Sequence, residues 1–329
     1  MNPFQPLYDA CNSGDPQEKH DGLPAFPRII DIELTNACNF RCLMCPTGNL
    51  SMKRPSGFMD AGLYHKILEQ CVDHKTALRF IGWGEPTLHP GLRYFVLTAS
   101  ADAGLLTHLN TNGAKIDLGY AAELVDAELS SIKFSFQGVD RATYEEMRRT
   151  DFYQGMIKAI WMVRATRGSR ALPFIAASTT ITHETPEMVA AFRAEVGPLV
   201  DHLSIGHTVF DFMDLKAVRL RPNEKAMLER LAGLASGDKK HPVPCPEVYD
   251  KLTIHWDGSV SVCCNDFDGL TNLGNVNDVP LSAIWRHPVM ESYRRRLADK
   301  EYTGPLCSVC YDYQGLSQGA KKDAPALVA

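Results

Sequence analysis

Short hydrophobic segments alternate with stretches of helical periodicity over the first two thirds of the chain. Segments rich in apolar and β-branched residues predict strands at 29–35, 77–82, 105–110, 129–136, 173–181 and 200–206. Between them, apolar residues recur at helical spacing at 60–73, 121–126, 141–166 and 186–196. Strands that alternate with helices predict an α/β fold with a parallel sheet. Six such units in about 180 residues favour a partial (β/α)6 TIM-like barrel, because a closed barrel of eight units typically needs about 250 residues.

The pattern changes after residue 221. A helix is expected from 222 to about 235, and segments 252–256 and 259–263 flank Asp257-Gly258, a pair typical of a hairpin turn. Residues 281–299 are expected to be helical, with Pro288 interrupting the helix. These features predict a smaller C-terminal α+β domain. The expected organisation is a loose N-terminal arm, the barrel, the smaller domain and a flexible tail, at 1–27, 28–222, 223–318 and 319–329.

Composition and charge argue against several classes of partner. The 329 residues carry a net charge of −5, and the chain has no basic stripe of the kind that binds nucleic acid or an anionic membrane surface. No apolar run approaches the roughly 18 residues that span a bilayer, and the first residues lack the features of a signal peptide. We therefore expect a cytoplasmic protein whose ten cysteines are reduced and serve metal binding or redox chemistry.

Three of these cysteines form the most informative cluster in the sequence. Cys38, Cys42 and Cys45 have C-x3-C-x2-C spacing and directly follow the first predicted strand. This position places them at the carboxyl-terminal rim of the strands, where such barrels carry their chemistry. Three thiolates on one loop can hold a [4Fe–4S] cluster while one iron lacks a protein ligand. A zinc loop completed by a histidine is the alternative.

The loops after the next predicted strands carry polar and glycine-rich motifs. They are Gly84-Glu85-Pro86, Thr111-Asn112-Gly113 and Ser135-Phe136-Gln137-Gly138. In register with the cysteine loop, these motifs resemble those of the radical SAM enzymes over approximately residues 29–210. The resemblance implies a [4Fe–4S] cluster that binds S-adenosyl-L-methionine and a reducing partner such as flavodoxin or ferredoxin.

The same resemblance implies which residues bind S-adenosylmethionine. Arg148 matches a position that often meets the methionyl carboxylate, although a solvated helix charge is an equal alternative, and Met44 stands where the family commonly has an aromatic residue. Ser135 and Gln137 are expected to bond ribose hydroxyls. The implied cofactor-binding residues are Met44, Gly84, Glu85, Pro86, Asn112, Ser135, Gln137 and Arg148.

A second group of four cysteines follows the barrel, at Cys245, Cys263, Cys307 and Cys310. Four thiolates suit either tetrahedral zinc or a fully ligated [4Fe–4S] cluster. Their order, with Gly258 before Cys263, resembles the SPASM and twitch extensions of radical SAM enzymes. The resemblance implies one auxiliary [4Fe–4S] cluster, since no cysteine follows Cys310.

Cys264 is an additional thiol beside this group. If Cys263 is a ligand, the neighbouring side chain in a strand points to the opposite face. Cys264 is then a candidate catalytic residue that donates a hydrogen atom to a substrate radical, as an epimerase requires. The alternative is a small buried residue. Asp266 is similarly a candidate general base or a turn-forming aspartate.

The sequence supports three functional hypotheses. The first is a radical SAM oxidoreductase or epimerase of a carbohydrate-like or other small molecule, bound near Trp83, Asp211 and the hairpin. The small-molecule substrate is favoured because the 37 residues before Cys38 are too few for a leader-peptide-binding domain. The second hypothesis is a peptide-modifying maturase, and the third is a zinc-stabilised binding protein.

Overall fold

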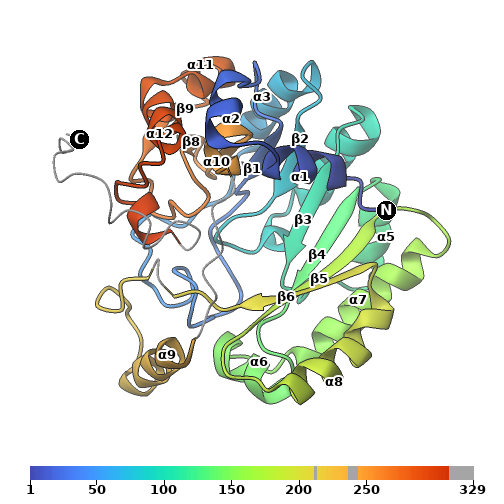
Figure 1. Ribbon diagram of the computed structural model, residues 1–329. Helices are drawn as coiled ribbons and strands as arrows, with labels where there is room; N and C mark the ends of the chain where they lie inside the picture. Colours follow the sequence, from blue (N-terminus) through green and yellow to red (C-terminus); the bar gives the residue numbers. More distant parts are fainter. Residues whose placement is uncertain (211–212, 236–243, 311–329) are drawn as a thin grey trace.

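A nine-stranded sheet organises the part of the chain that the computed structural model describes, which is residues 1–210, 213–235 and 244–310 (Figure 1). The strand order is β6-β5-β4-β3-β2-β1-β7-β8-β9, and β1 to β6 are parallel. The parallel strands are β1 (Ile29–Ile32), β2 (Ala77–Phe80), β3 (Thr107–Thr111), β4 (Ser131–Ser135), β5 (Phe174–Ile181) and β6 (His202–His207). The predicted α/β fold with a partial barrel is confirmed.

Alternation along the strands separates a hydrophobic face from a polar face. Ile30, Ile32 and Leu78 are fully buried in the hydrophobic core, and Asp31 and Arg79 point to the other, concave side. The core face is covered by α3 (Ala61–Val72), α4 (Leu92–Leu97), α5 (Leu118–Asp126), α6 (Arg141–Arg148), α7 (Tyr153–Arg167) and α8 (Pro186–Val196). The polar side chains are thereby collected inside the partial barrel.

The predicted helix over 141–166 is two helices in the structure. Arg149, at the end of α6, has a φ of 60°, which is a left-handed conformation that ends a helix. The chain then restarts as α7 at Tyr153. Hydrophobic periodicity continues through the break, so it did not reveal the turn.

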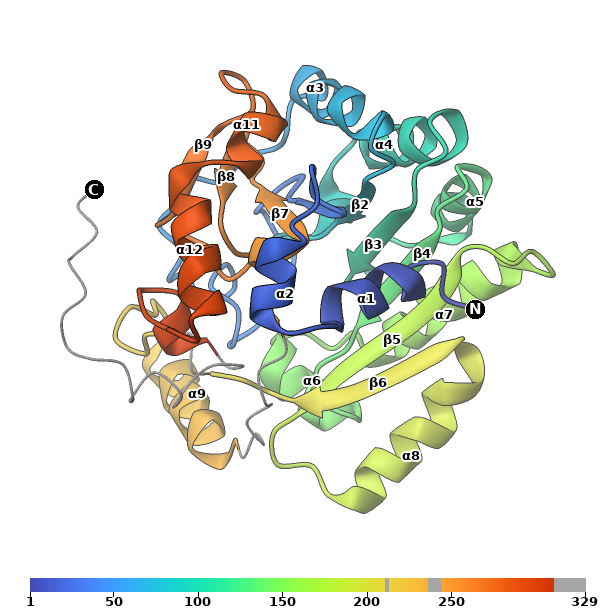
Figure 2. The same cartoon turned by 45° about the horizontal axis from the view of Figure 1, so that its top comes forward.

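The expectation of a loose arm over 1–27 is wrong in its local structure. This segment contains α1 (Gln5–Asn12) and α2 (Pro16–Asp21), and Asp15 caps α2 through hydrogen bonds from Gln17 N and Glu18 N. Phe4 is fully buried with Ile29 at the amino ends of the strands. Figures 1 and 2 show α1 across this end of the sheet, opposite to α5 and α7. The N-terminal helices thus close the bottom of the partial barrel.

The C-terminal strands extend the barrel sheet. The hairpin of β7 (Lys251–Ile254) and β8 (Ser259–Ser261) forms as predicted, but β7 also pairs in parallel with β1. Strand β9 (Asn272–Asn275) completes the sheet. The remaining helices are α9 (Pro222–Leu234), α10 (Pro246–Tyr249), α11 (Leu281–Trp285) and α12 (Pro288–Ala298). The smaller C-terminal unit is therefore joined to the barrel by backbone hydrogen bonds.

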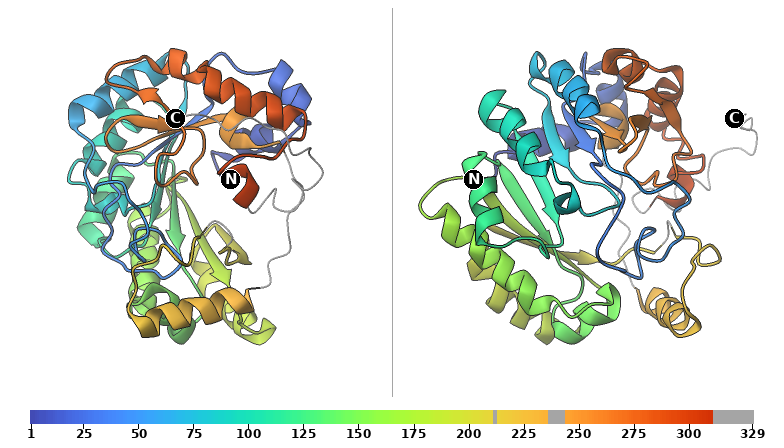
Figure 3. Two further views of the ribbon diagram at one scale, coloured as in Figure 1. Left: turned by 90° about the vertical axis from the view of Figure 1, so that its left-hand side faces the viewer. Right: turned by 180° about the vertical axis from the view of Figure 1, so that it is seen from behind.

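The N-terminal and C-terminal elements also lie side by side, as Figure 3 shows for α2 and α12. His20 Nε2 and Glu291 Oε1 are 2.9 Å apart across this contact, and Lys19 Nζ lies 2.8 Å from Asp250 Oδ2. Among the described helices, none has the length and hydropathy needed to cross a membrane.

Candidate active site

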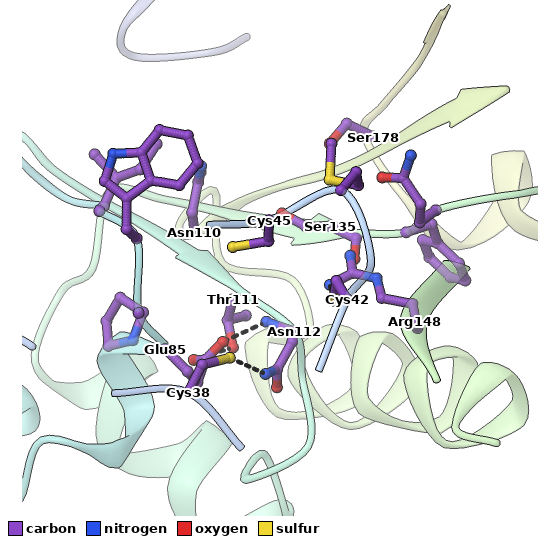
Figure 4. Close-up of a pocket in the computed structure, with 18 of the residues that line it drawn as sticks. Cys38, Cys42, Cys45, Glu85, Asn110, Thr111, Asn112, Ser135, Arg148 and Ser178 are labelled. Carbon is purple, nitrogen blue, oxygen red and sulfur yellow. Dashed lines mark hydrogen bonds between the residues drawn. The ribbon is translucent and has the colours of Figure 1, made fainter. Parts of the chain in front are cut away.

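The three clustered cysteines lie on the loop between β1 and α3 and line one cavity of about 390 Å³ (Figure 4). Main-chain contacts hold the loop, because Leu43 N donates to Met147 O at 2.9 Å and Asn49 Nδ2 donates to Leu43 O at 3.0 Å. A Cβ on Gly48 would lie only 2.3 Å from the Cys42 carbonyl oxygen, so the tight loop needs glycine there. The predicted arrangement of Cys38, Cys42 and Cys45 around one space is present.

The pKa values of these thiols indicate which kind of group the loop can bind. Burial raises the pKa of Cys38 to about 12, with further contributions from Cys42, Glu85 and Cys45. Burial also raises the pKa of Cys45. Thiolates are the metal-binding form, and a bound cation is what stabilises several of them in such surroundings. Three cysteine side chains that line one cavity fit a cluster with one iron left without a protein ligand.

Glu85 organises the ends of β2 and β3. Its Oε1 accepts hydrogen bonds from Thr87 Oγ1 at 2.7 Å and Thr111 Oγ1 at 2.8 Å, and its Oε2 accepts from Asn112 N at 2.7 Å. Burial raises the pKa of Glu85, although these hydrogen bonds oppose the shift. Both carboxylate oxygens already have partners in the chain, so the carboxylate fixes the loops that border the cavity. The role of Glu85 in binding S-adenosylmethionine remains a prediction.

Asn112 connects this carboxylate to the cysteine loop. Its Nδ2 donates to Asn39 Oδ1 at 2.8 Å and lies 3.9 Å from Cys38 Sγ (Figure 4). Gly84 permits the close approach of the two loops, because a Cβ there would lie 2.2 Å from Thr35 O. The second and third strand ends therefore position the first cysteine.

Arg148 lies against the cysteine loop, so the alternative of a solvated helix charge is wrong. Its guanidinium donates to the Ser135 carbonyl and, at 3.5 Å, to Cys42 Sγ. Its Nε is buried and has no hydrogen-bond partner among the described residues. A buried donor without a partner, on a residue that lines the cavity, fits a bound anionic group such as a carboxylate.

The other predicted cofactor-binding residues also line the cavity. Gln137 is already engaged, because its amide donates to Thr208 Oγ1 at 2.9 Å and to Thr180 Oγ1. Its predicted bond to a ribose hydroxyl, like that of Ser135, stays a prediction. The remaining lining residues from the predicted set are Met44, Gly84, Pro86 and Ser135.

The second cysteine group is also brought together. Cys245, Cys263, Cys307 and Cys310 line one pocket between α10, the β8 loop and the C-terminal turn. Burial, Glu247 and Cys307 raise the pKa of Cys245, and burial with Cys310 raises the pKa of Cys307 to about 11. Four cysteine side chains that line one pocket fit a fully ligated cluster, whereas the three of the first group fit a cluster with one open iron.

Cys264 does not point away from Cys263 as the strand argument predicted. Strand β8 ends at Ser261, so both cysteines lie in the following turn. The two sulfur atoms and a Glu247 carboxylate oxygen lie within 4.8 Å of one another. Among the described residues, Cys264 belongs to the lining of neither cavity. Asp266 is 1% exposed and accepts from Leu270 N and Thr271 N at 2.7 and 2.8 Å, as a turn-forming residue does.

Two side chains connect the cysteine groups. Trp83 lines the first cavity, and its indole Nε1 donates to the Cys264 carbonyl at 2.9 Å. Arg54 donates to both Glu33 oxygens at 2.8 and 2.9 Å and to Phe267 O at 2.6 Å. Trp83 was expected near the substrate, whereas the Glu33–Arg54 pair was not predicted from the sequence. The sequence signal for this pair is the carboxylate of Glu33, which lies next to a hydrophobic strand segment. Asp211 lies outside the described residues.

Comparison with protein families identifies both cysteine regions. Residues 32–206 match the model of the Radical SAM superfamily, and residues 245–311 match SPASM, an iron–sulfur cluster-binding domain. The first match covers more than half of the chain.

Individual relatives are more distant. The AdoMet-dependent heme synthase of Methanosarcina barkeri is 25% identical over 91% of this chain and 93% of its own length. The PqqA peptide cyclase of Methylorubrum populi is 31% identical over 39% of this chain and 32% of its length. In three curated relatives the chain matches only 22% to 43% of their length.

Solved structures share the fold. Streptococcus suis SuiB bound to the precursor peptide SuiA superposes with a TM-score of 0.64, over 84% of this chain and 68% of that one, at 18% identity. The crystal structure of BtrN in complex with AdoMet and 2-DOIA gives a TM-score of 0.54, over 86% and 92% of the two chains, at 17% identity.

Proposed function

This chain belongs to the radical SAM superfamily and carries an SPASM iron–sulfur cluster-binding domain, and on this premise we propose that it oxidises a polar small molecule at one carbon. A [4Fe–4S] cluster with S-adenosylmethionine would supply a 5′-deoxyadenosyl radical to remove a hydrogen atom from a C–H bond, and an auxiliary cluster would accept one further electron as the substrate loses a proton. We assign the open cluster to Cys38, Cys42 and Cys45. The auxiliary cluster is assigned to Cys245, Cys263, Cys307 and Cys310.

The contact between Trp83 and Cys264 is the observation that carries this proposal. Trp83 borders the cavity of the first cysteine group, and the Cys264 carbonyl that it bonds follows Cys263 directly. A substrate that contacts Trp83 in the cavity is then connected through this one side chain to the residue next to Cys263, in the second cysteine group. Polar residues border the cavity and suit a hydroxyl-bearing substrate; they are Asn110, Ser135, Ser178 and Thr180.

Oxidation is favoured over epimerisation by the placement of the thiols. An epimerase needs a hydrogen-atom donor in the substrate cavity, and the thiols among the described lining residues are those of Cys38, Cys42 and Cys45. We assign these three to iron. Cys264 lies instead beside Cys263 and Glu247, so it is unsuited to quench a substrate radical in that cavity.

The remaining residues of the site orient the cysteines and offer a donor to an anionic group. Arg148 holds Cys42 and offers its buried Nε to an anionic group, and Asn112 holds Cys38. Glu85 fixes Asn112 through the main chain. These contacts hold the three cysteines at the cavity, where they would bind a cluster.

Iron analysis and product analysis under anaerobic conditions test the proposal. Two [4Fe–4S] clusters require about eight irons per chain, and reduced enzyme with S-adenosylmethionine is expected to release 5′-deoxyadenosine. Cys42→Ala is expected to abolish this release and to retain the auxiliary iron. The oxidised product is lighter than its substrate by the mass of two hydrogens. A product that instead gains one deuterium from deuterated water is an epimer and contradicts the oxidation.

A peptide substrate is the second candidate. The relatives include proteins named PqqA peptide cyclase and Mycofactocin maturase MftC, and the SuiB structure contains a precursor peptide. Turnover of a ribosomal precursor peptide, with no small molecule stimulating 5′-deoxyadenosine release, selects this candidate. Stoichiometric zinc without iron rejects both candidates.

A further inference from the structure

Lys133 of β4 lies on the concave side of the sheet, directly below the active-site cavity. Strand register places it between Asn110 of β3 and Ala176 of β5. Two residues farther along β4, Ser135 is paired with Ser178. Asn110, Ser135 and Ser178 line the cavity. Because side chains on one face repeat every second residue, Lys133 belongs to the layer that forms the cavity floor.

The other end of the barrel interior is closed. Phe4, which precedes α1, is fully buried and packs edge-on against His108, with ring centroids 5.6 Å apart. His108 lies in the layer below Lys133, since it pairs with Ser131. Lys133 itself is only partly buried. Phe4 and His108 cover the side below Lys133, so an anion that contacts its ammonium would approach from the carboxyl ends of the strands, where Asn110 of the same layer lines the cavity.

Nearby carboxylates are already neutralised by other cations. Asp31 Oδ1 lies 2.5 Å from Arg79 Nε, and Glu247 Oε1 lies 2.8 Å from Lys251 Nζ. Glu33 is paired in the same way with Arg54. The Lys133 ammonium, by contrast, forms no hydrogen bond or contact ion pair with any residue that the structure describes, and Asp31 attracts it only at longer range. Each of these three carboxylates therefore has a cationic partner at contact distance other than Lys133.

A free hydrogen-bond donor lies beside this charge. His108 Nε2 and Asn110 Oδ1 are 2.7 Å apart. Burial, with the nearby Lys133 and Arg79, lowers the pKa of His108 to about 3, so its ring is neutral. Because the Asn110 Oδ1 atom can only accept, the His108 tautomer is the one whose Nε2–H donates to it. The Asn110 amide NH₂ then has no acceptor among the described residues and faces the cavity that Asn110 lines.

We propose that Lys133 is a specificity residue that binds an anionic group of the substrate, a carboxylate or a phosphate, with the Asn110 amide as a second donor. This inference rests on the proposed function and narrows its substrate to anionic molecules. An unpaired, partly desolvated ammonium is costly, and a charge-assisted hydrogen bond from it to an anion offsets that cost. Arg148, on the cysteine loop side of the cavity, is a separate site for the methionyl carboxylate of S-adenosylmethionine.

Chemical protection of the lysines tests the proposal without a known substrate. The reconstituted enzyme is treated with limiting acetic anhydride, and acetylation of Lys133 and Lys158 is followed by mass spectrometry. Lys158 on α7 is exposed and serves as the internal control. Acetate or inorganic phosphate, at constant ionic strength, is expected to slow acetylation of Lys133 about tenfold or more, as charge-assisted binding predicts, and to leave Lys158 unchanged. The more protective anion identifies carboxylate or phosphate as the recognised group.

Variants separate this proposal from the other possibilities. Lys133→Met is expected to weaken binding of the protective anion about 10- to 100-fold, while Lys133→Arg retains most of it and Lys158→Met retains all. Absence of protection by both anions overturns the inference. Protection by S-adenosylmethionine alone, with weaker cofactor binding in Lys133→Met, also overturns it, because the anion is then the cofactor carboxylate. Failure of the wild-type enzyme to release 5′-deoxyadenosine contradicts the proposed function but leaves the anion-binding result intact.

Discussion

The indole Nε1 of Trp83 donates a 2.9 Å hydrogen bond to the carbonyl oxygen of Cys264. The two residues are 181 positions apart in the chain, and they belong to the two cysteine regions. The Trp83 ring also packs edge-on against Phe267, with centroids 5.5 Å apart. This contact ties the loop after β2 to the loop after β8. It fixes one wall of the cavity against the second cysteine group.

Removal of the hydrogen bond between Trp83 and Cys264 is expected to weaken the contact between the loops after β2 and β8. Trp83→Phe keeps an aromatic ring against Phe267 but leaves the Cys264 carbonyl without its donor. Loss of a hydrogen bond with a net contribution of about 1 kcal/mol lowers the melting temperature by about 1–4 °C. Calorimetry of the reconstituted protein measures the shift. Trp161→Phe is the control, because that ring is 54% exposed, and equal shifts in the two variants contradict a specific role for the contact.

The sequence predicted the barrel well because its strands are determined by local hydrophobic patterns. Helix α8 (Pro186–Val196) coincides with its prediction, since Thr185 caps it and Pro186 begins it. The parallel pairing of β7 with β1 was not predictable in this way. It joins residues more than 200 positions apart, and nothing local in Lys251–Ile254 distinguishes a barrel strand from an independent hairpin. The packing of Phe4 against His108 is non-local in the same sense.

The two cysteine neighbours, Cys263 and Cys264, are expected to behave differently on substitution. Cys263 lines the pocket with the other three cysteines, whereas Cys264 does not. Cys263→Ala is therefore expected to lose the auxiliary iron, about four of eight atoms per chain. Cys264→Ala is expected to retain all iron and to give the same product. Iron analysis with product mass spectrometry distinguishes them, and an altered product from Cys264→Ala restores the hydrogen-donor hypothesis.

The buried pair of Glu33 and Arg54 is expected to contribute strongly to stability. Side-chain exposure is 1% for Glu33 and 9% for Arg54. Burial raises the pKa of Glu33, but His255 and Arg54 outweigh it and hold the pKa below its usual value. Arg54→Met removes the arginine partner of a buried carboxylate and leaves His255 as its other side-chain partner in the described residues, at a cost of about 3–5 kcal/mol. Urea unfolding measures this loss. The neighbouring exposed Lys53→Met is the control, and a loss below about 1 kcal/mol for Arg54→Met contradicts the expectation.

At the site, as in the fold, features set by local sequence were predictable and features set by distant contacts were not. Motif spacing brought Cys38 and Arg148 to the correct cavity, because consecutive strand ends meet at one rim. The predicted direction of the Cys264 side chain was wrong, because this direction depends on where strand β8 ends. Lys133 was not recognised, because its unpaired charge becomes visible only when the partners of Asp31, Glu33 and Glu247 are known.

The Lys133 side chain gives the folded protein a distinctive response to alkaline pH. Burial, together with Arg79 and Lys251, lowers the pKa of Lys133 from 10.5 to about 8, and Asp31 only partly opposes this shift. His108 is the further titratable group beside it, and it is neutral throughout this range. Between about pH 8 and 10.5 the unfolded chain therefore binds a proton at this lysine that the folded chain has released. Under this condition the free energy of unfolding rises with pH.

Wild-type protein is thus expected to gain stability relative to Lys133→Met as the pH rises from about 8 to 10.5. The gain is roughly 1–3 kcal/mol, because each pKa unit corresponds to about 1.4 kcal/mol and the partial exposure of the side chain reduces the effect. Urea unfolding of both proteins at several pH values, without added acetate or phosphate, measures the difference. Other alkaline effects cancel in this comparison, and Lys158→Met is expected to follow the wild type at every pH. A stability difference between wild type and Lys133→Met that stays constant with pH contradicts the partly buried, unpaired ammonium on which the anion site depends.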